Sequence, residues 1–147
     1  MKHPKEEVTY VMLKPDGVKK GLIGEVIRRF EQRDLKIVAL EMFEPEFDKV
    51  NDHYPKSEEW ITRLGNKTLT TYEKYGYDAM KDFGTTDAAT IGPEIRKWLI
   101  DYMTSAPLVK MIVKGVHSVD VVRKIAGDTM PYKAELGTIR GDFSIDS

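Results

Sequence analysis

The chain has 147 residues, of which 41% are hydrophobic and 32% are charged, and this balance fits one soluble domain with a single core. Its 23 basic and 24 acidic side chains give a net charge of -1, which excludes a general attraction to nucleic acid or to an anionic membrane. There is no cysteine, so the chain has no disulfide framework, no thiolate nucleophile and no cysteine-based zinc site. We expect a cytoplasmic protein, because the N-terminal sequence lacks the apolar core of a signal peptide and no apolar run is long enough to span a membrane.

The first third of the chain predicts a strand, a helix and a second strand. Residues 8–13 form an apolar run that ends at a Pro-Asp-Gly turn, and this run predicts a strand buried on both faces. From Leu22 to Phe30 the apolar residues recur at helical spacing with charged residues between them, which predicts an amphipathic helix. Residues 35–43 are apolar with β-branched members and end before a Glu-Pro pair, so they predict the second strand.

The remainder alternates between clear and unclear patterns. A short helix is expected at 48–54, whereas residues 56–92 lose periodicity and predict an elaboration packed on the domain, with short helices near Trp60 and Tyr72. Helical spacing returns at 93–104, where Pro93 suits a first helical position, and residues 107–115 predict a third strand. Ser118 is expected to cap a further helix that Gly127 ends, followed by a loop over 128–139.

This order of elements predicts an α+β fold. It fits a ferredoxin-like βαββαβ arrangement, in which helices lie on one face of an antiparallel sheet, except that the final strand is missing or incomplete. The prediction is a single domain over residues 1–147 with an inserted elaboration at about 56–92.

The residues that suit phosphate binding lie on separate elements. The chain has neither a glycine-rich phosphate loop nor a dinucleotide fingerprint, so any nucleotide would be held by side chains. A phosphate chain needs several convergent cationic donors, and three cations and a hydroxyl beside turn signals are candidates for such a cradle. They are Lys14, Arg123, Thr129 and Arg140. The alternative is that these side chains are ordinary solvated surface groups.

Three stretches resemble the nucleoside-diphosphate kinase family. They are MLKPDGVKKGLIGEVIRRFEQRDLKIVALEM at 12–42, LIDYMTSAPLVKMIVKG at 99–115 and VVRKIAGDTMPYKAELGTIRGDFS at 121–144. The motifs are specific, because KPDG after a first strand rarely coincides with GTIRGD after a GDT loop. The similarity covers most of the chain outside the segment 56–92.

The resemblance implies transfer of the terminal phosphate of a nucleoside triphosphate, such as ATP, to a nucleoside diphosphate through a phosphohistidine. Lys14 is implied to reach the sugar hydroxyl and the phosphate end, and Tyr54 of the HY pair to lie beside the catalytic histidine. The residues implied to hold the phosphates are Arg123, Thr129 and Arg140. A homo-oligomer is also implied, with no membrane partner and no sequence-specific nucleic acid.

The implied cofactor is Mg²⁺ carried by the nucleotide. It leaves little trace in a sequence, because it binds mainly through phosphates and waters, and no residue is assigned as its ligand. Asp16 and Asp142 are candidates for a water-mediated contact, and turn or cap roles are the alternative for both.

No residue in the chain is assigned as the nucleophile. The family carries it in an N-x-x-H-G-S-D stretch, and the spacing from Arg140 puts both its asparagine and its histidine a few residues past Ser147. His3, His53 and His117 are each expected to have a structural or surface role. The alternative function is therefore a nucleotide-binding form that does not transfer phosphate.

Other departures limit what the resemblance implies. The segment after the HY pair is longer than in short family members, so the base-stacking residue stays open, with Trp60, Tyr72 and Trp98 as candidates and Arg96 near the usual position. The sequence ELGT stands where many members carry KPGT, so the proline of a loop tied to subunit contacts is replaced by Leu136. Adhesion through the RGD triplet at 140–142 and RNA binding by an aromatic-rich sheet are not favoured.

Overall fold

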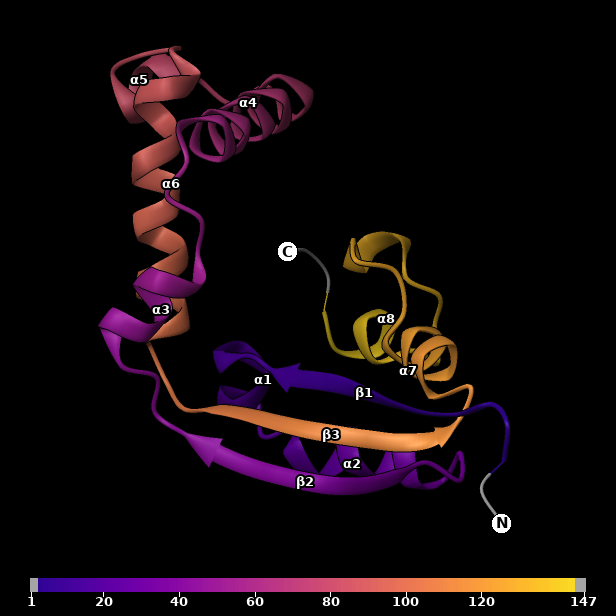
Figure 1. Cartoon of the computed structure of the whole chain (residues 1–147). Helices are drawn as coiled ribbons and strands as arrows, with labels where there is room; N and C mark the ends of the chain where they lie inside the picture. The colour runs from indigo at the N-terminus through magenta and orange to yellow at the C-terminus, as the bar shows by residue number, and fades with distance from the viewer. Residues whose placement is uncertain (1–2, 145–147) are drawn as a thin grey trace. The chain divides into compact units, whose positions relative to one another are not determined.

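A computed structural model describes residues 3–144, and the chain divides into two compact units (Figure 1). The first unit contains the chain up to Phe43 and from Pro107 onward, and the second contains Glu44–Ala106. Among the described residues, no helix is both long enough and apolar enough to cross a membrane.

The first unit consists of a three-stranded sheet and short helices. The order of strands in the sheet is β1-β3-β2, and both pairings are antiparallel. The sheet and its helices confirm the predicted α+β, ferredoxin-like fold. Within residues 3–144, β1 and β2 are the two edge strands, and the sheet has no fourth strand. The elements, in chain order, are β1 (Glu6–Leu13), α1 (Pro15–Lys19), α2 (Ile23–Glu31), β2 (Lys36–Phe43), β3 (Leu108–Val116), α7 (Ser118–Ala126), η1 (Pro131–Lys133) and α8 (Ile139–Phe143).

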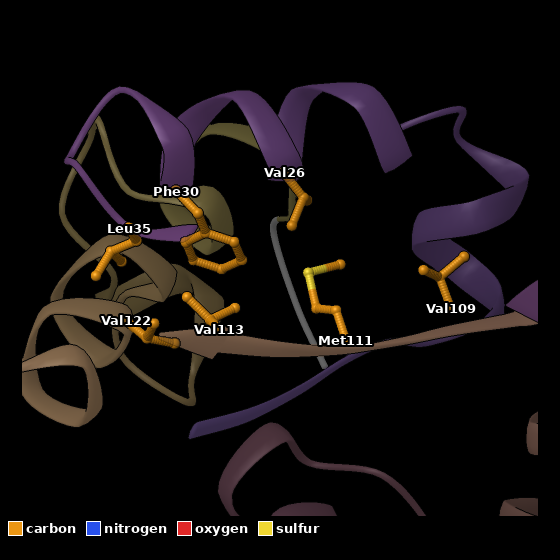
Figure 2. Packing of buried hydrophobic residues seen from close by; sticks show 7 residues of the cluster. All are labelled: Val26, Phe30, Leu35, Val109, Met111, Val113 and Val122. Atoms are coloured by element: carbon orange, nitrogen blue, oxygen red, sulfur yellow. The ribbon is translucent and has the colours of Figure 1, made fainter. Parts of the chain in front are cut away.

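The core of this unit lies between β3 and the two longer helices. Figure 2 shows Val26 and Phe30 of α2 directed toward the middle strand, and Val122 of α7 belongs to the same cluster. Helices α2 and α7 therefore cover the same face of the sheet. The cluster consists of Val26, Phe30, Leu35, Val109, Met111, Val113 and Val122.

The prediction that the first strand is buried on both faces is wrong. Val8 and Tyr10 are 60% and 53% exposed, whereas Val11 and Leu13 pack against the core cluster. Successive side chains of a strand point to opposite faces, so an apolar run need not be buried on both.

The second unit contains four helices: α3 (Phe47–His53), α4 (Glu58–Tyr75), α5 (Ala79–Phe83) and α6 (Ala88–Met103). Helices α4 and α6 pack against each other, and α3 packs against α6. Two glycines allow the close approach of α4 and α6: a Cβ at Gly65 would overlap the carbonyl oxygen of Ala88, and a Cβ at Gly92 would overlap that of Ile61.

The short helices expected near Trp60 and Tyr72 are instead one helix, α4, of 18 residues. Its first turn is capped by Ser57, whose side chain accepts a hydrogen bond from the Trp60 amide at 3.4 Å. The threonine hydroxyls of its polar stretch donate to backbone carbonyls one turn earlier, for example Thr68 to Leu64 at 3.0 Å. These threonines therefore fit into the helix, although they interrupt the apolar periodicity by which a helix is recognised in a sequence.

Two predicted helix starts are wrong. Helix α6 begins at Ala88, because the Asp87 carboxylate accepts the Thr90 amide at 2.9 Å, and Pro93 lies inside the helix. Helix α7 is preceded by His117 in a left-handed conformation, with φ of 54°. Ser118 is the first helical residue and is fully buried, so it is not the cap.

Candidate functional site

Lys14 lies at the junction of β1 and α1. It is the extended residue that precedes the helix, followed by the buried Pro15 at the first helical position. Gly17 packs so closely on Leu13 that a Cβ there would overlap the leucine side chain, which fixes α1 against the end of the strand. The Lys14 side chain is exposed and makes no hydrogen bond or ion pair with the described residues.

Arg123 and Thr129 lie on and just after α7. Arg123 belongs to the last turn of that helix, and its carbonyl accepts the amide of Gly127 at 3.0 Å. Gly127 ends the helix, as predicted, with a φ of 85° and a ψ of 179°, and this glycine conformation redirects the chain toward Thr129. Both side chains are exposed, and neither has a hydrogen-bond or ionic partner within residues 3–144.

Arg140 lies on α8, a helix where the sequence analysis predicted no element. Thr138 caps α8 by accepting the Gly141 amide at 3.0 Å. The guanidinium of Arg140 donates through Nη1 to the Gly127 carbonyl at 2.8 Å. This partner is neutral, so the bond orients Arg140 without compensating its charge.

These four residues come from adjoining elements of the first unit. The Arg140–Gly127 bond joins α8 to the loop that carries Thr129, and Lys20 Nζ joins the end of α1 to α8 by donating to the Phe143 carbonyl at 2.8 Å. Helix α7 packs against β1 and against α8. The elements that carry the three cations and the hydroxyl are therefore linked to one another, and none of the three cations is paired with a described carboxylate.

The neighbouring arginines of α2 are neutralised. Arg29 is 12% exposed and contacts Glu25 and Asp142, at 2.8 and 2.7 Å. Arg28 binds the same Glu25 at 2.8 Å. The two guanidinium groups lower the pKa of Glu25 from its ordinary value of 4.5 to about 2. Both arginines line a hollow of about 440 Å³ with Arg33 and Lys124, and the four phosphate-site candidates lie outside its lining.

Asp142 is occupied by protein contacts. One carboxylate oxygen accepts the Gly137 amide at 2.8 Å, and the other accepts Arg29 Nη2 at 2.7 Å. The Gly137 amide and the Arg29 guanidinium lower the pKa of Asp142 below its usual range. These contacts are structural ones, while the water-mediated magnesium contact stays a prediction. No group of three or more histidine, cysteine, aspartate or glutamate side chains suited to a metal is found among residues 3–144.

Tyr54 belongs to the second unit, at the end of α3. Its ring is tilted against Trp60, with centroids 6.1 Å apart, and burial raises the pKa of its hydroxyl. Arg96 holds this turn, a role that its sequence position does not reveal. Arg96 donates to the carbonyls of Asn51, Tyr54 and Pro55 at 2.6, 3.1 and 3.1 Å, and to the Asn51 side chain at 2.9 Å.

The candidates for base stacking remain unassigned. Trp60 faces Tyr54, whereas Tyr72 donates its hydroxyl to Asp82 at 3.2 Å. Trp98 packs on Phe83 with ring centroids 5.6 Å apart and is 48% exposed.

The three histidines are all exposed. His3 accepts the Lys5 amide through Nδ1 at 3.1 Å, and the ring of His53 meets Tyr54 edge-on at 5.4 Å. His117 provides the left-handed residue before α7. These positions agree with surface or structural roles.

Comparisons with known proteins agree on one family. A family model described as nucleoside diphosphate kinase matches residues 7–62 and 92–147. The nucleoside diphosphate kinase of Pyrobaculum aerophilum is 48% identical over 141 residues, which cover 96% of this chain and 77% of that protein. A crystal structure of an NDP kinase from Pyrobaculum aerophilum aligns with a TM-score of 0.83 at 46% identity, over 97% of this chain and 78% of that one.

A more distant structure has a ligand in its description. It is a transition state mimic of nucleoside-diphosphate kinase from Borrelia burgdorferi with bound vanadate and ADP, and it aligns with a TM-score of 0.62 at 33% identity over 97% of this chain and 68% of that one. Because the family model matches more than half of the chain and the Pyrobaculum aerophilum protein is nearly half identical to it, the chain belongs to the nucleoside diphosphate kinase family.

Proposed function

We propose that this protein transfers the terminal phosphate of a nucleoside triphosphate to a nucleoside diphosphate, and that Lys14, Arg123, Thr129 and Arg140 bind the phosphates. The observation that carries the proposal is the set of uncompensated cations in the first unit. Lys14 and Arg123 are exposed and without described partners, and Arg140 is oriented by a neutral carbonyl. A polyphosphate is the complementary ligand, because its charge satisfies several cationic donors at once.

Each side chain has a distinct task in this proposal. Lys14 supplies a compact charge beside the phosphate end, and Arg123 and Arg140 supply planar forks for the phosphate oxygens. Thr129 supplies a hydroxyl that donates to a phosphate oxygen. Phosphoryl transfer asks a protein mainly for such positioning and for charge around the oxygens of the moving group.

The transfer proceeds in two displacements at phosphorus. A neutral imidazole nitrogen forms a bond to the terminal phosphorus while the bond to the bridging oxygen breaks, and a nucleoside diphosphate leaves. An oxygen of the acceptor diphosphate then attacks the same phosphorus, and the imidazole leaves. The imidazole is proposed to be that of the histidine in the family's N-x-x-H-G-S-D stretch.

Magnesium is proposed to arrive with the nucleotide, where it neutralises charge on the phosphate oxygens. The residues of the first unit fit this division of tasks. Asp142 has both carboxylate oxygens occupied, by the Gly137 amide and by Arg29. The side chains proposed to bind the phosphates are three cations and a hydroxyl, which suit phosphate oxygens and not a metal ion.

The test is incubation of the full-length protein with Mg²⁺ and ATP labelled in its terminal phosphate. We expect an acid-labile phosphoenzyme that disappears when unlabelled GDP is added, with the label recovered in GTP. Binding of ADP with no phosphoenzyme would support the alternative, a nucleotide-binding form without transfer. Failure to bind ADP at all would contradict both functions.

Three further properties remain predictions. A site that reads phosphate and sugar predicts similar turnover with purine and pyrimidine diphosphates. A homo-oligomer predicts a solution mass by light scattering that is a multiple of the chain mass. Cell fractionation tests the expected cytoplasmic location.

A further inference from the structure

We propose that Arg29 is a positioning residue for nucleotide binding. It holds the α8 segment, residues 137–143, so that Arg140 faces the phosphates. This inference rests on the proposed function, because it needs Arg140 to bind the nucleotide. Arg29 lies on α2, far from Arg140 in the sequence. It is not among the residues predicted to bind the nucleotide, and the family resemblance implied no role for it.

Arg29 joins α2 to both ends of the α8 segment. Its Nη1 donates to the Gly137 carbonyl at 3.1 Å, and its Nη2 donates to the Asp142 carboxylate at 2.7 Å. Its Nε donates to Glu25 of its own helix at 2.8 Å, which fixes the side chain from behind. The guanidinium also lies over the Phe143 ring, 4.8 Å from its centroid.

The segment needs such an anchor because a helix this short is not stable by itself. Helix α8 has five residues, whereas isolated helices shorter than roughly 12 residues are marginal in water. Asp142 closes the segment on itself by accepting the Gly137 amide, and Arg29 contacts both of these residues.

Arg140 lies between these two anchored residues. Its guanidinium reaches the Gly127 carbonyl from this helix, so its direction depends on where the helix is held. Loss of the Arg29 contacts would allow the helical turn that carries Arg140 to move. Arg29 thus acts on the nucleotide through Arg140, without contacting the ligand itself.

The contacts require the planar fork of arginine. Two different nitrogens reach two acceptors, one before α8 and one within it, while the flat face covers an aromatic ring. A lysine keeps the charge, but all its N–H donors are on a single nitrogen. Arg28 is the matched control, because it is 59% exposed and, among residues 3–144, donates only to Glu25 and Gln32 of the α2 region.

The experiment is a double-mutant cycle on the full-length protein, with ADP as the probe in calorimetric titrations. Four proteins form the cycle: the wild type, Arg29→Lys, Arg140→Ala and the double variant, with Arg28→Lys as control. We expect Arg29→Lys to weaken ADP binding by roughly tenfold in the wild-type background and less than about twofold when Arg140 is alanine. Arg28→Lys should leave the Kd unchanged.

Amide hydrogen exchange supplies the second measurement and needs no ligand. Exchange should accelerate in residues 137–143 of Arg29→Lys, while the amides of β3 keep their protection. Loss of protection throughout the first unit would mean that Arg29 supports the fold in general, and it would overturn the inference.

The outcomes separate the two proposals. If Arg140→Ala weakens ADP binding but Arg29→Lys does not, the phosphate site stands and the positioning role is wrong. Equal effects of Arg29→Lys in both backgrounds also overturn the positioning role. If Arg140→Ala leaves the Kd unchanged, the phosphate site fails, and the role of Arg29 fails with it.

Discussion

Replacement of Gly141 by alanine should displace the helix that carries Arg140. A Cβ at this position would overlap the carbonyl oxygen of Glu135 and lie 2.9 Å from the Thr138 hydroxyl. The first of these neighbours is backbone, so it cannot move aside as the tip of a flexible side chain does. Helix α8 must therefore shift away from the 135–138 turn, and Arg140 shifts with it.

The magnitude follows from comparison with a second glycine in a helix. Gly24 lies in the first turn of α2, and a Cβ there would meet nothing within 4 Å. Both changes gain helical propensity of about 0.5–1 kcal/mol, so the difference between the two variants isolates the overlap at Gly141. Forcing a methyl group into a packed site costs about 1–3 kcal/mol, and this is the expected gap in stability.

The assay must report on the first unit. Both tryptophans, Trp60 and Trp98, lie in the second unit, so their fluorescence reports on that unit. Native-state exchange of the β3 amides measures the free energy of opening of the first unit directly. Equal exchange in Gly141→Ala and Gly24→Ala, with equal affinity for ADP, would refute the close approach of α8 to the turn before it.

Three other predictions concern other parts of the molecule. Phe30 is 1% exposed in the core cluster, and Phe30→Ala should lower the opening free energy of the β3 amides by about 3–5 kcal/mol. As its control, Tyr10→Ala on the exposed face of the sheet should change this free energy by less than about 1 kcal/mol. Gly92→Ala should lower the urea midpoint followed by tryptophan fluorescence, since its Cβ would overlap the Ile61 carbonyl, and an unchanged midpoint would contradict the close packing of α4 on α6. The pKa of Glu25 is lower in the folded state, so its contribution to stability is present above its ordinary pKa of 4.5 and is lost as the pH falls toward about 2. The opening free energy of the first unit should therefore decrease over that interval, and Glu25→Gln should reduce the decrease.

The strands and the two amphipathic helices of the first unit were predictable from the sequence, because their apolar residues face one core. The same spacing does not say how many faces of a strand are buried, so the exposure of Val8 and Tyr10 was not predictable from it. Helix α4 was missed as one element because its polar face carries hydroxyls that bond to its own backbone, and that pattern has no helical apolar period. Pro93 was read as a helix start, although the Asp87 cap begins the helix five residues earlier.

The candidate site was predictable only in part. Lys14, Arg123 and Thr129 lie beside turns that a sequence reveals through proline and glycine. The contacts of Arg29 with Asp142 and of Arg96 with the Tyr54 turn join residues 113 and 42 positions apart. Side chains of this kind look like solvated surface groups in a sequence, because only the folded chain brings their partners to them.

Titration of the full-length protein with ADP tests the central claim most directly, with Lys14→Ala, Arg123→Ala and Arg140→Ala compared with Arg28→Ala. Loss of a charge-assisted hydrogen bond is worth about 1.5–3 kcal/mol, so each of the first three should weaken binding by roughly 10- to 100-fold. Arg28→Ala, which removes a cation of the same unit bound within the α2 region, should change the Kd by less than about threefold. Four similar values of Kd, all close to that of the wild type, would contradict the phosphate site.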